Sequence, residues 1–345
     1  MIYRTPTYYW DFRCIAGDCR DSCCKGWEID IDEDTARYYA GVGGEFGERL
    51  RSSIRDGSFL LTEDERCPFF NKSGLCDIYT ELGGDKLCRI CSDHPRYYEW
   101  FGSVKEGGVG LCCEAAAELM ISRPFALCEE EVPDETASGD YDEELFAMLI
   151  DAREEMFTVL ADETKPLCDC LCRLLDIASE MQLCIDMPFP DGETEVAAEA
   201  ALRGAFDLLS ELEPIDEKWQ PYIAECTGKL SCSPARNSGT DVFLRRLGSY
   251  FIFRYLLKSV FDGEVLSHAK FAVFSLIVLD RLFRLSGSSA PETCALIAKN
   301  YSKETEYCEE NMEKLLLRLG EAPEFSLMSL KVLLMASMGG NMDEF

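Results

Sequence analysis

The sequence predicts a mainly α-helical protein in which a cysteine-rich, loop-dominated metal-binding region, residues 1–128, packs on a helical domain, residues 144–345. Two observations support this fold class. Ten of the 19 cysteines fall in the first 113 residues among glycines and aromatic residues, and from about residue 142 apolar residues recur every three or four positions. A chain of 345 residues with 47% hydrophobic residues is long enough for one large or two modest cores.

Only short helices are expected in the first region. One is predicted at 33–39, with Asp32 or Asp34 as its cap, and another at 114–121, where Glu-Ala-Ala-Ala-Glu has high helix propensity. The second begins directly after Cys112 and Cys113. Because a helix N-terminus presents N–H groups and partial positive charge, it lowers the pKa of a neighbouring thiol and favours metal ligation.

Residues 129–143 are acidic and rich in turn-forming residues, and we interpret them as a linker. Beyond them the helical period is clear, for example in Leu145, Leu149, Ala152 and Met156. Further helices are predicted near 194–212, 217–229, 241–261, 264–285, 290–300, 304–319 and 324–338.

The net charge of −30, from 34 Lys plus Arg against 64 Asp plus Glu, disfavours nucleic acid and anionic membranes as partners. It would attract a lysine-bearing protein, although an acidic surface is also a common solubility device. The N-terminus lacks the apolar segment of a secretory signal. The longest nearly apolar run, 271–279, is far shorter than the roughly 20 residues of a membrane span. A cytoplasmic location without a membrane span is therefore expected.

An odd number of cysteines in a reducing cytoplasm makes a disulfide framework a weaker explanation than metal binding. The candidate metal ligands are Cys14, Cys19, Cys23, Cys24, Cys67, Cys76, Cys88, Cys91, Cys112 and Cys113.

The first four of these cysteines lie within eleven residues. They can close around one centre only if the backbone turns tightly, for which Gly17 and Gly26 are well placed. The adjacent residues Cys23 and Cys24 direct their sulfurs differently. One of the two can therefore serve a neighbouring metal or simply pack.

The later cysteines include the pair Cys88-x2-Cys91, a common spacing for zinc or iron. Ten thiols allow one four-cysteine cluster with further cysteines that bind no metal, or two such sites with two cysteines left over. The sequence leaves both arrangements open. Zinc and iron–sulfur clusters both accept thiolate ligands. The numerous and unevenly spaced thiols favour an iron–sulfur cluster, with zinc as the alternative. His94 is either a further ligand or a residue that orients its loop.

An isolated cysteine usually packs as a small hydrophobic residue. We expect this of Cys128, Cys168, Cys170, Cys172, Cys184, Cys226, Cys232, Cys294 and Cys308, and a packed role for His268.

No catalytic base or cofactor-binding residue can be named from the sequence. The common Cys-x3-Cys-x2-Cys of radical enzymes that cleave S-adenosylmethionine is missing, as are the glycine-rich nucleotide-binding motifs. Arg254 and Tyr255 are candidates to reach from the helical domain to the cysteines. Some polar residues beside the cysteine motifs are more typical of packing or solvated surface than of a site: Tyr97, Tyr98, Glu99 and Glu114.

The run Phe12-x-Cys14-Ile15-Ala-Gly17-x-Cys19-x-Asp21-x-Cys23-Cys24-x-Gly26-Trp27 resembles the opening of the flagellin lysine-N-methylase family, which is related to a broad group of zinc- or iron-chelating cysteine-cluster proteins. Later motifs follow in the same order, namely Cys67-Pro68-Phe69, Gly74-x-Cys76-x-Ile78, Cys91-x-x-His94-Pro95-Arg96 and Cys112-x-Glu114. The resemblance covers roughly residues 8–120. The chain departs from the family pattern at Cys113, where proline is expected, and at Ala117, where arginine is expected.

The resemblance implies an enzyme that transfers a methyl group from S-adenosylmethionine to lysine ε-amines of flagellin and contains an iron–sulfur cluster, expected to be of the 4Fe–4S type. Two alternatives stay open. One is a module without enzymatic activity that binds zinc or iron or senses redox state. The other is a methyltransferase in which zinc only stabilises the fold.

Overall fold

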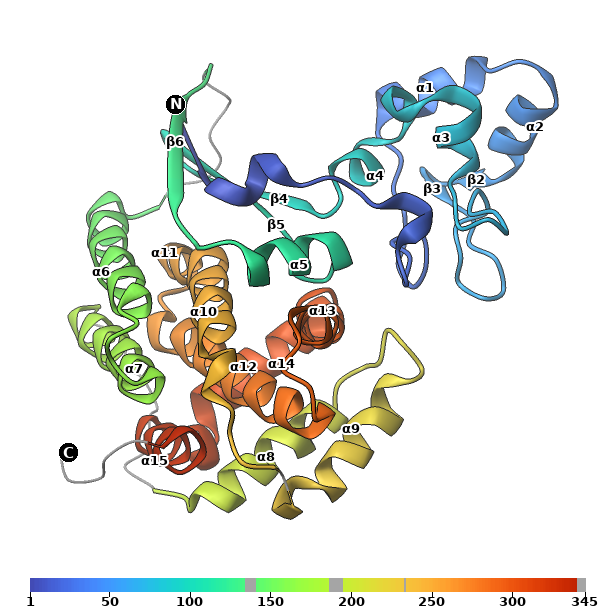
Figure 1. Cartoon of the computed structure of the whole chain (residues 1–345). Coiled ribbons are helices and arrows are strands. Elements are labelled where there is room, and N and C mark those ends of the chain that lie inside the picture. Colours follow the sequence, from blue (N-terminus) through green and yellow to red (C-terminus); the bar gives the residue numbers. More distant parts are fainter. Residues whose placement is uncertain (134–140, 186–194, 233, 340–345) are drawn as a thin grey trace.

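The computed structural model describes residues 1–133, 141–185, 195–232 and 234–339. It confirms the mainly α-helical fold. A large helical region carries a small sheet on one side, and residues 24–93, here called the lobe, project beyond that sheet (Figure 1).

The sheet joins segments that are distant in the sequence. Its strands are β1 (Ile2–Pro6), β4 (Arg96–Phe101), β5 (Val104–Val109) and β6 (Leu127–Glu131). The order is β4-β5-β1-β6, with β1 parallel to β5 and the other pairs antiparallel. Strand β6 includes residues 129–131, so the segment predicted as a linker begins inside the sheet. Residues 134–140 of that segment lie outside the described residues.

The lobe has a core of its own. Its elements are α1 (Glu33–Gly41), α2 (Gly44–Ser52), β2 (Ile54–Arg55), β3 (Ser58–Phe59), α3 (Asp77–Leu82) and α4 (Arg89–Asp93). Asp32 caps α1 by accepting a hydrogen bond from Thr35 N at 3.0 Å, as the sequence predicted. Aromatic and aliphatic side chains such as Tyr39, Phe59 and Phe69 pack together in a hydrophobic cluster separate from that of the helical region.

The helical region contains α5 (Glu114–Ser122), α6 (Glu143–Ala161), α7 (Leu167–Cys184), α8 (Ala198–Ser210), α9 (Trp219–Gly228), α10 (Asp241–Tyr255), α11 (Ser259–Asp262), α12 (Val265–Ser286), α13 (Pro291–Glu306), α14 (Glu309–Glu321) and α15 (Leu327–Met338). The predicted break between residues 300 and 304 is wrong, because α13 continues to Glu306. Its last turn is polar but buried, which a pattern of apolar residues cannot show.

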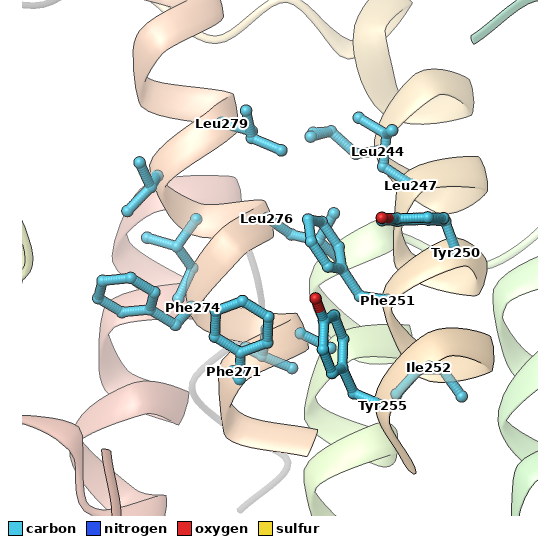
Figure 2. Packing of buried hydrophobic residues seen from close by; sticks show 14 of the residues in the cluster. Leu244, Leu247, Tyr250, Phe251, Ile252, Tyr255, Phe271, Phe274, Leu276 and Leu279 are labelled. Atoms are coloured by element: carbon cyan, nitrogen blue, oxygen red, sulfur yellow. The ribbon is translucent and has the colours of Figure 1, made fainter. Parts of the chain in front are cut away.

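Helix α12 lies at the centre of the helical region, and its side chains from Val265 to Phe283 are buried. Figure 2 shows Phe251 and Tyr255 of α10 against Phe271 of α12, and their rings meet edge to face at centroid distances of 5.7 and 5.2 Å. Across the described ranges, no helix combines the length and apolarity that crossing a bilayer requires.

The sheet is fixed to the helical region by a buried ion pair. Arg153 of α6 donates to Glu106 of β5 through two nitrogens, at 2.8 and 2.5 Å. Helix α5, which follows β5, packs against α10 and α13. These contacts place the end of β5, and the two cysteines after it, against α13.

Candidate metal centre

All ten predicted ligand cysteines line one cavity of about 660 Å³. The cavity lies between the lobe and the helical region, since its wall also includes Ile215, Lys299, Lys303 and Tyr307. All ten are free thiols. The structure therefore brings together cysteines that lie up to 99 residues apart in the sequence.

Local backbone structure directs these thiols. Gly26 has a φ of 85°, as its predicted turn requires. The turn before Cys19 instead places its positive φ, 48°, on Ala16 rather than on Gly17. Cys113 is the N-cap of α5, so the predicted helix start beside this thiol is confirmed. Cys76 and Cys88 occupy the same position at the short helices α3 and α4.

Burial dominates the acid–base properties of these thiols. It raises the pKa of Cys67 and of Cys112 to about 12, and that of Cys113 to about 11. The lower thiol pKa expected at the start of α5 is therefore wrong, because burial outweighs the opposing effect of the backbone N–H groups of this helix. These thiols therefore hold their protons at neutral pH. A metal that bound them would have to displace those protons, which makes its affinity dependent on pH.

Glu114 is buried at the cavity wall and joins two cysteine segments. It accepts hydrogen bonds from Arg20 N at 2.8 Å and from Arg20 Nε at 2.6 Å, and the Cys19 thiol lies 3.6 Å from the same carboxylate. The expectation of a solvated surface position is wrong for Glu114, because the loop that contains Cys19 folds over it.

Two lysines of α13 reach the cavity from the helical region. Lys299 and Lys303 both contact the carboxylate of Asp21, which lies in the loop between Cys19 and Cys23. Sequence reasoning missed these three residues. The spacing of four along one helix was visible, but nothing in the sequence pointed to their partner in the first loop.

Arg254 links the helical region to the cavity indirectly. Its guanidinium lies over the Tyr97 ring, with Cζ 4.4 Å from the centroid, and over Tyr307, at 5.5 Å. Tyr307 lines the cavity and hydrogen-bonds Cys112. Tyr255 instead donates to Glu306 at 2.7 Å.

Three other candidates from the sequence, Tyr98, Glu99 and His268, lie outside the cavity wall. Glu99 forms an ion pair with Lys258 at 2.9 Å, and the Tyr98 hydroxyl lies 3.3 Å from that of Tyr9. His268 is buried and contacts Asp262 at 2.8 Å, which confirms its packed role. His94 does line the cavity, and burial lowers its pKa to about 4, so it is neutral at physiological pH.

The nine remaining cysteines do not line this cavity. Burial is confirmed for Cys168, Cys170, Cys172, Cys226 and Cys294. The predicted packed position is wrong for Cys184, at the end of α7, and for Cys232, because both cysteines are exposed.

Within the described ranges, no three His, Cys, Asp or Glu side chains converge closely enough to surround a single metal ion. One zinc ion binds each thiolate at about 2.3 Å, so its ligands nearly touch. In a four-iron cluster each cysteine binds a different iron, and the thiols stand further apart around the cluster. Both groups accept thiolate ligands, so the donor set of the cavity wall suits either of them.

The fold and the site define the class of protein. It is a mainly helical protein in which a small lobe lies over a cavity lined by thiols. Comparison with known proteins adds a name for its relatives. The chain is 25% identical over 139 residues to proteins named lysine-N-methylase from Salmonella choleraesuis and Salmonella typhimurium, covering 36% of this chain and 34% of each relative. It is 24% identical over 135 residues to a flagellar biosynthetic protein FliU from Salmonella muenchen, covering 35% of this chain and 78% of the relative.

These relatives support the resemblance to the flagellin lysine-N-methylase family. The aligned part spans about a third of the length of the two lysine-N-methylases. No family model and no solved structure matches the chain.

Proposed function

We propose that this protein is an S-adenosylmethionine-dependent protein lysine N-methyltransferase that acts on flagellin and carries an iron–sulfur cluster of the 4Fe–4S type. The observation that carries the proposal is the gathering of all ten cysteines of the family-like region around one cavity. The names of the similar proteins support the reaction and the substrate.

The donor set suits the proposed cofactor, because thiolate is the ligand that iron–sulfur clusters use. Cys14, Cys19, Cys23 and Cys113 would hold it on the side of the cavity that faces α13. A cluster bound by all four thiols would supply a path for one electron, and a cluster bound by only three of them would leave one iron open for the methyl donor. We assign no side chain as catalytic base.

The acceptor lysine must lose its proton before it can attack a methyl group, and its ordinary pKa is about 10.4. Apolar side chains of the cavity wall, such as Ile15, Leu75 and Ile215, would desolvate an inserted amine and lower that pKa. The chain's charge of −30 would attract a basic, lysine-bearing segment.

The test is methyl transfer by protein purified without oxygen. Flagellin and S-adenosylmethionine with a labelled methyl group are added, and mass spectrometry locates any methylated lysine. We expect ε-N-methyl-lysine on flagellin, and none when the flagellin lysines are replaced by arginine or when the variant Cys19→Ser/Cys113→Ser is used.

The opposite result is equally specific. Metal-loaded protein that gives no methylated flagellin, and no heat of S-adenosylmethionine binding in calorimetry, would reject the methyltransferase and favour the metal-binding or redox-sensing module.

A further inference from the structure

We propose that a second cavity, beside the thiol-lined one, binds the adenosyl group of the methyl donor. This cavity has a volume of about 400 Å³ and lies between α9, the end of α12 and α13. Its size is within the roughly 300–1,000 Å³ of most small-molecule sites. The inference rests on the proposed function and adds the place where the donor binds.

The two cavities share a wall. Lys303 of α13 lines both of them, whereas Ile215 lines the first and the next residue, Asp216, lines the second. The carboxylate of Glu304 fixes this wall, because it accepts hydrogen bonds from Ile215 N at 2.7 Å and from Asp216 N at 2.9 Å. Lys303 itself reaches Asp21 in the first cysteine loop, at 2.8 Å. The side chain of Lys303 thus borders both cavities.

The helices around the second cavity provide walls that suit a flat ring. Helix α9 contributes the aromatic rings of Trp219 and Tyr222, whose centroids are 6.1 Å apart, and α13 contributes Leu296 and Ile297. Nucleobases are flat, and they bind by packing on aromatic and aliphatic side chains. Trp219 is almost fully buried and Ile297 packs against the core of the helical region, so both walls are formed before a ligand binds.

The charged groups of this cavity suit a nucleoside with a zwitterionic tail better than a phosphate. Within the described part of the chain, three carboxylates and three ammonium groups line it: Asp216, Glu225, Glu304, Lys218, Lys229 and Lys303. Carboxylates repel the phosphates of a nucleotide, whereas a carboxylate beside a bound nucleoside can accept hydrogen bonds from the ribose hydroxyls. S-adenosylmethionine carries a ribose, a sulfonium, an ammonium and a carboxylate, but no phosphate.

Asp216 is the carboxylate best placed for the ribose. Its Oδ1 accepts a hydrogen bond from Lys218 N at 3.0 Å, and among the described residues no group donates to its Oδ2. Glu304 instead uses both oxygens for the shared wall, and Glu225 forms an ion pair with Lys229. Asp216 therefore keeps an oxygen for a ligand.

Methyl transfer requires that donor and acceptor approach from two sides. The lone pair of the neutral amine forms the new N–C bond as the C–S bond breaks. The electron pair of that bond stays on sulfur, and the positive charge passes from the sulfonium to the methylated amine. The amine and the sulfur therefore lie on opposite sides of the transferred carbon. Two cavities that meet at Lys303 provide this arrangement, with the amine in the first and the adenosyl group in the second.

The experiment measures S-adenosylmethionine binding by calorimetry in full-length protein purified without oxygen. Leu296→Trp fills the second cavity and should weaken binding by at least about tenfold. Leu317→Trp, at a position that is 57% exposed and outside both cavities, is the matched control and should bind as wild type does. Asp216→Asn can keep the hydrogen bond from Lys218 N but loses the charge, and should weaken binding about tenfold.

A second measurement locates the donor without any variant. Ultraviolet light crosslinks labelled S-adenosylmethionine to wild-type protein, and mass spectrometry identifies the attached peptide. We expect the label on α9 or α13 and not on the cysteine segments. Thermal unfolding shows whether Leu296→Trp is folded, and the crosslink decides the question if it is not.

Wild-type affinity in folded Leu296→Trp, or a crosslink confined to the cysteine segments, would overturn the inference. Loss of donor binding in Cys19→Ser/Cys113→Ser but not in Leu296→Trp would place the donor at an open iron and do the same. Methyl transfer to flagellin is assayed separately, so transfer alongside either result would leave the proposed function standing. Wild-type protein that neither binds the donor nor transfers a methyl group would reject both proposals.

Discussion

Lys303 of α13 places its Nζ 2.8 Å from Oδ2 of Asp21, in the loop between Cys19 and Cys23. Lys299, one turn earlier and almost fully buried, contacts the same oxygen. The side chains of Lys299, Lys303 and Asp21 are 4%, 15% and 28% exposed. The helical region thus holds the first cysteine loop by a partly buried ion pair that closes one side of the cavity.

Asp21→Asn should therefore loosen this loop. It leaves the buried ammonium of Lys299 without its counter-charge, and we expect a loss of about 2 kcal/mol in the free energy of unfolding, below the roughly 3–5 kcal/mol of a fully buried pair. Urea denaturation measures the loss. Asp18→Asn, an exposed position in the same loop, is the matched control. Equal stability of the two variants would contradict the role assigned to Asp21.

Arg153→Met should be more damaging, because it removes both short hydrogen bonds of the buried Glu106 carboxylate and leaves it only the weaker contact with Arg4, at 3.3 Å. The Arg153 and Glu106 side chains are 1% and 3% exposed, and we expect a loss of about 3–5 kcal/mol. Arg173→Met removes two exposed ion pairs, with Glu155 and Glu180, and should cost no more than about 1 kcal/mol. In thermal unfolding, the double variant Arg153→Met/Glu106→Leu should recover part of the loss, and failure to do so would show that packing matters more than charge.

Glu304 should make stability depend on pH. Burial raises its pKa from 4.5 to about 6, while hydrogen bonds from Ile215 N and Asp216 N oppose the shift. A raised folded-state pKa contributes stability below the unfolded value, and this stability is lost as the pH rises through about 6. The shift corresponds to about 2 kcal/mol.

The measurement is the unfolding free energy of wild type minus that of Glu304→Gln, from below pH 4.5 to above pH 6. Wild type should become relatively less stable across this range. A constant difference would show that folding does not shift the pKa of Glu304.

Gly110→Ala should disturb the wall beside Cys112. A Cβ at this position would overlap the Tyr307 hydroxyl and lie 3.3 Å from the carbonyl oxygen of Pro95. The ring must move, and we expect a loss of about 1–3 kcal/mol, the usual cost of overpacking. Gly228→Ala, where a Cβ meets nothing within 4 Å, is the control and should be neutral or slightly stabilising. Differential scanning calorimetry compares the two variants.

Sequence periodicity was sufficient for most helices, because an amphipathic helix repeats its apolar face every few residues. It failed at the end of α13. Glu306 there is buried because Tyr250 and Tyr255 each donate a hydrogen bond to it at 2.7 Å. The sheet was also missed, since β1 pairs with β5 and β6, segments about 100 residues away.

By itself, the sequence determined which residues are the candidate ligands, because cysteine density and spacing are local properties of the chain. It also determined that a helical domain follows, because helical periodicity is local. Only the tertiary structure decided that all ten thiols line one cavity, that Lys299 and Lys303 border it, and that Cys24 packs against the cluster of the lobe whereas Cys113 packs against that of the helical region. These relationships depend on contacts between segments up to 282 residues apart, which no local pattern encodes.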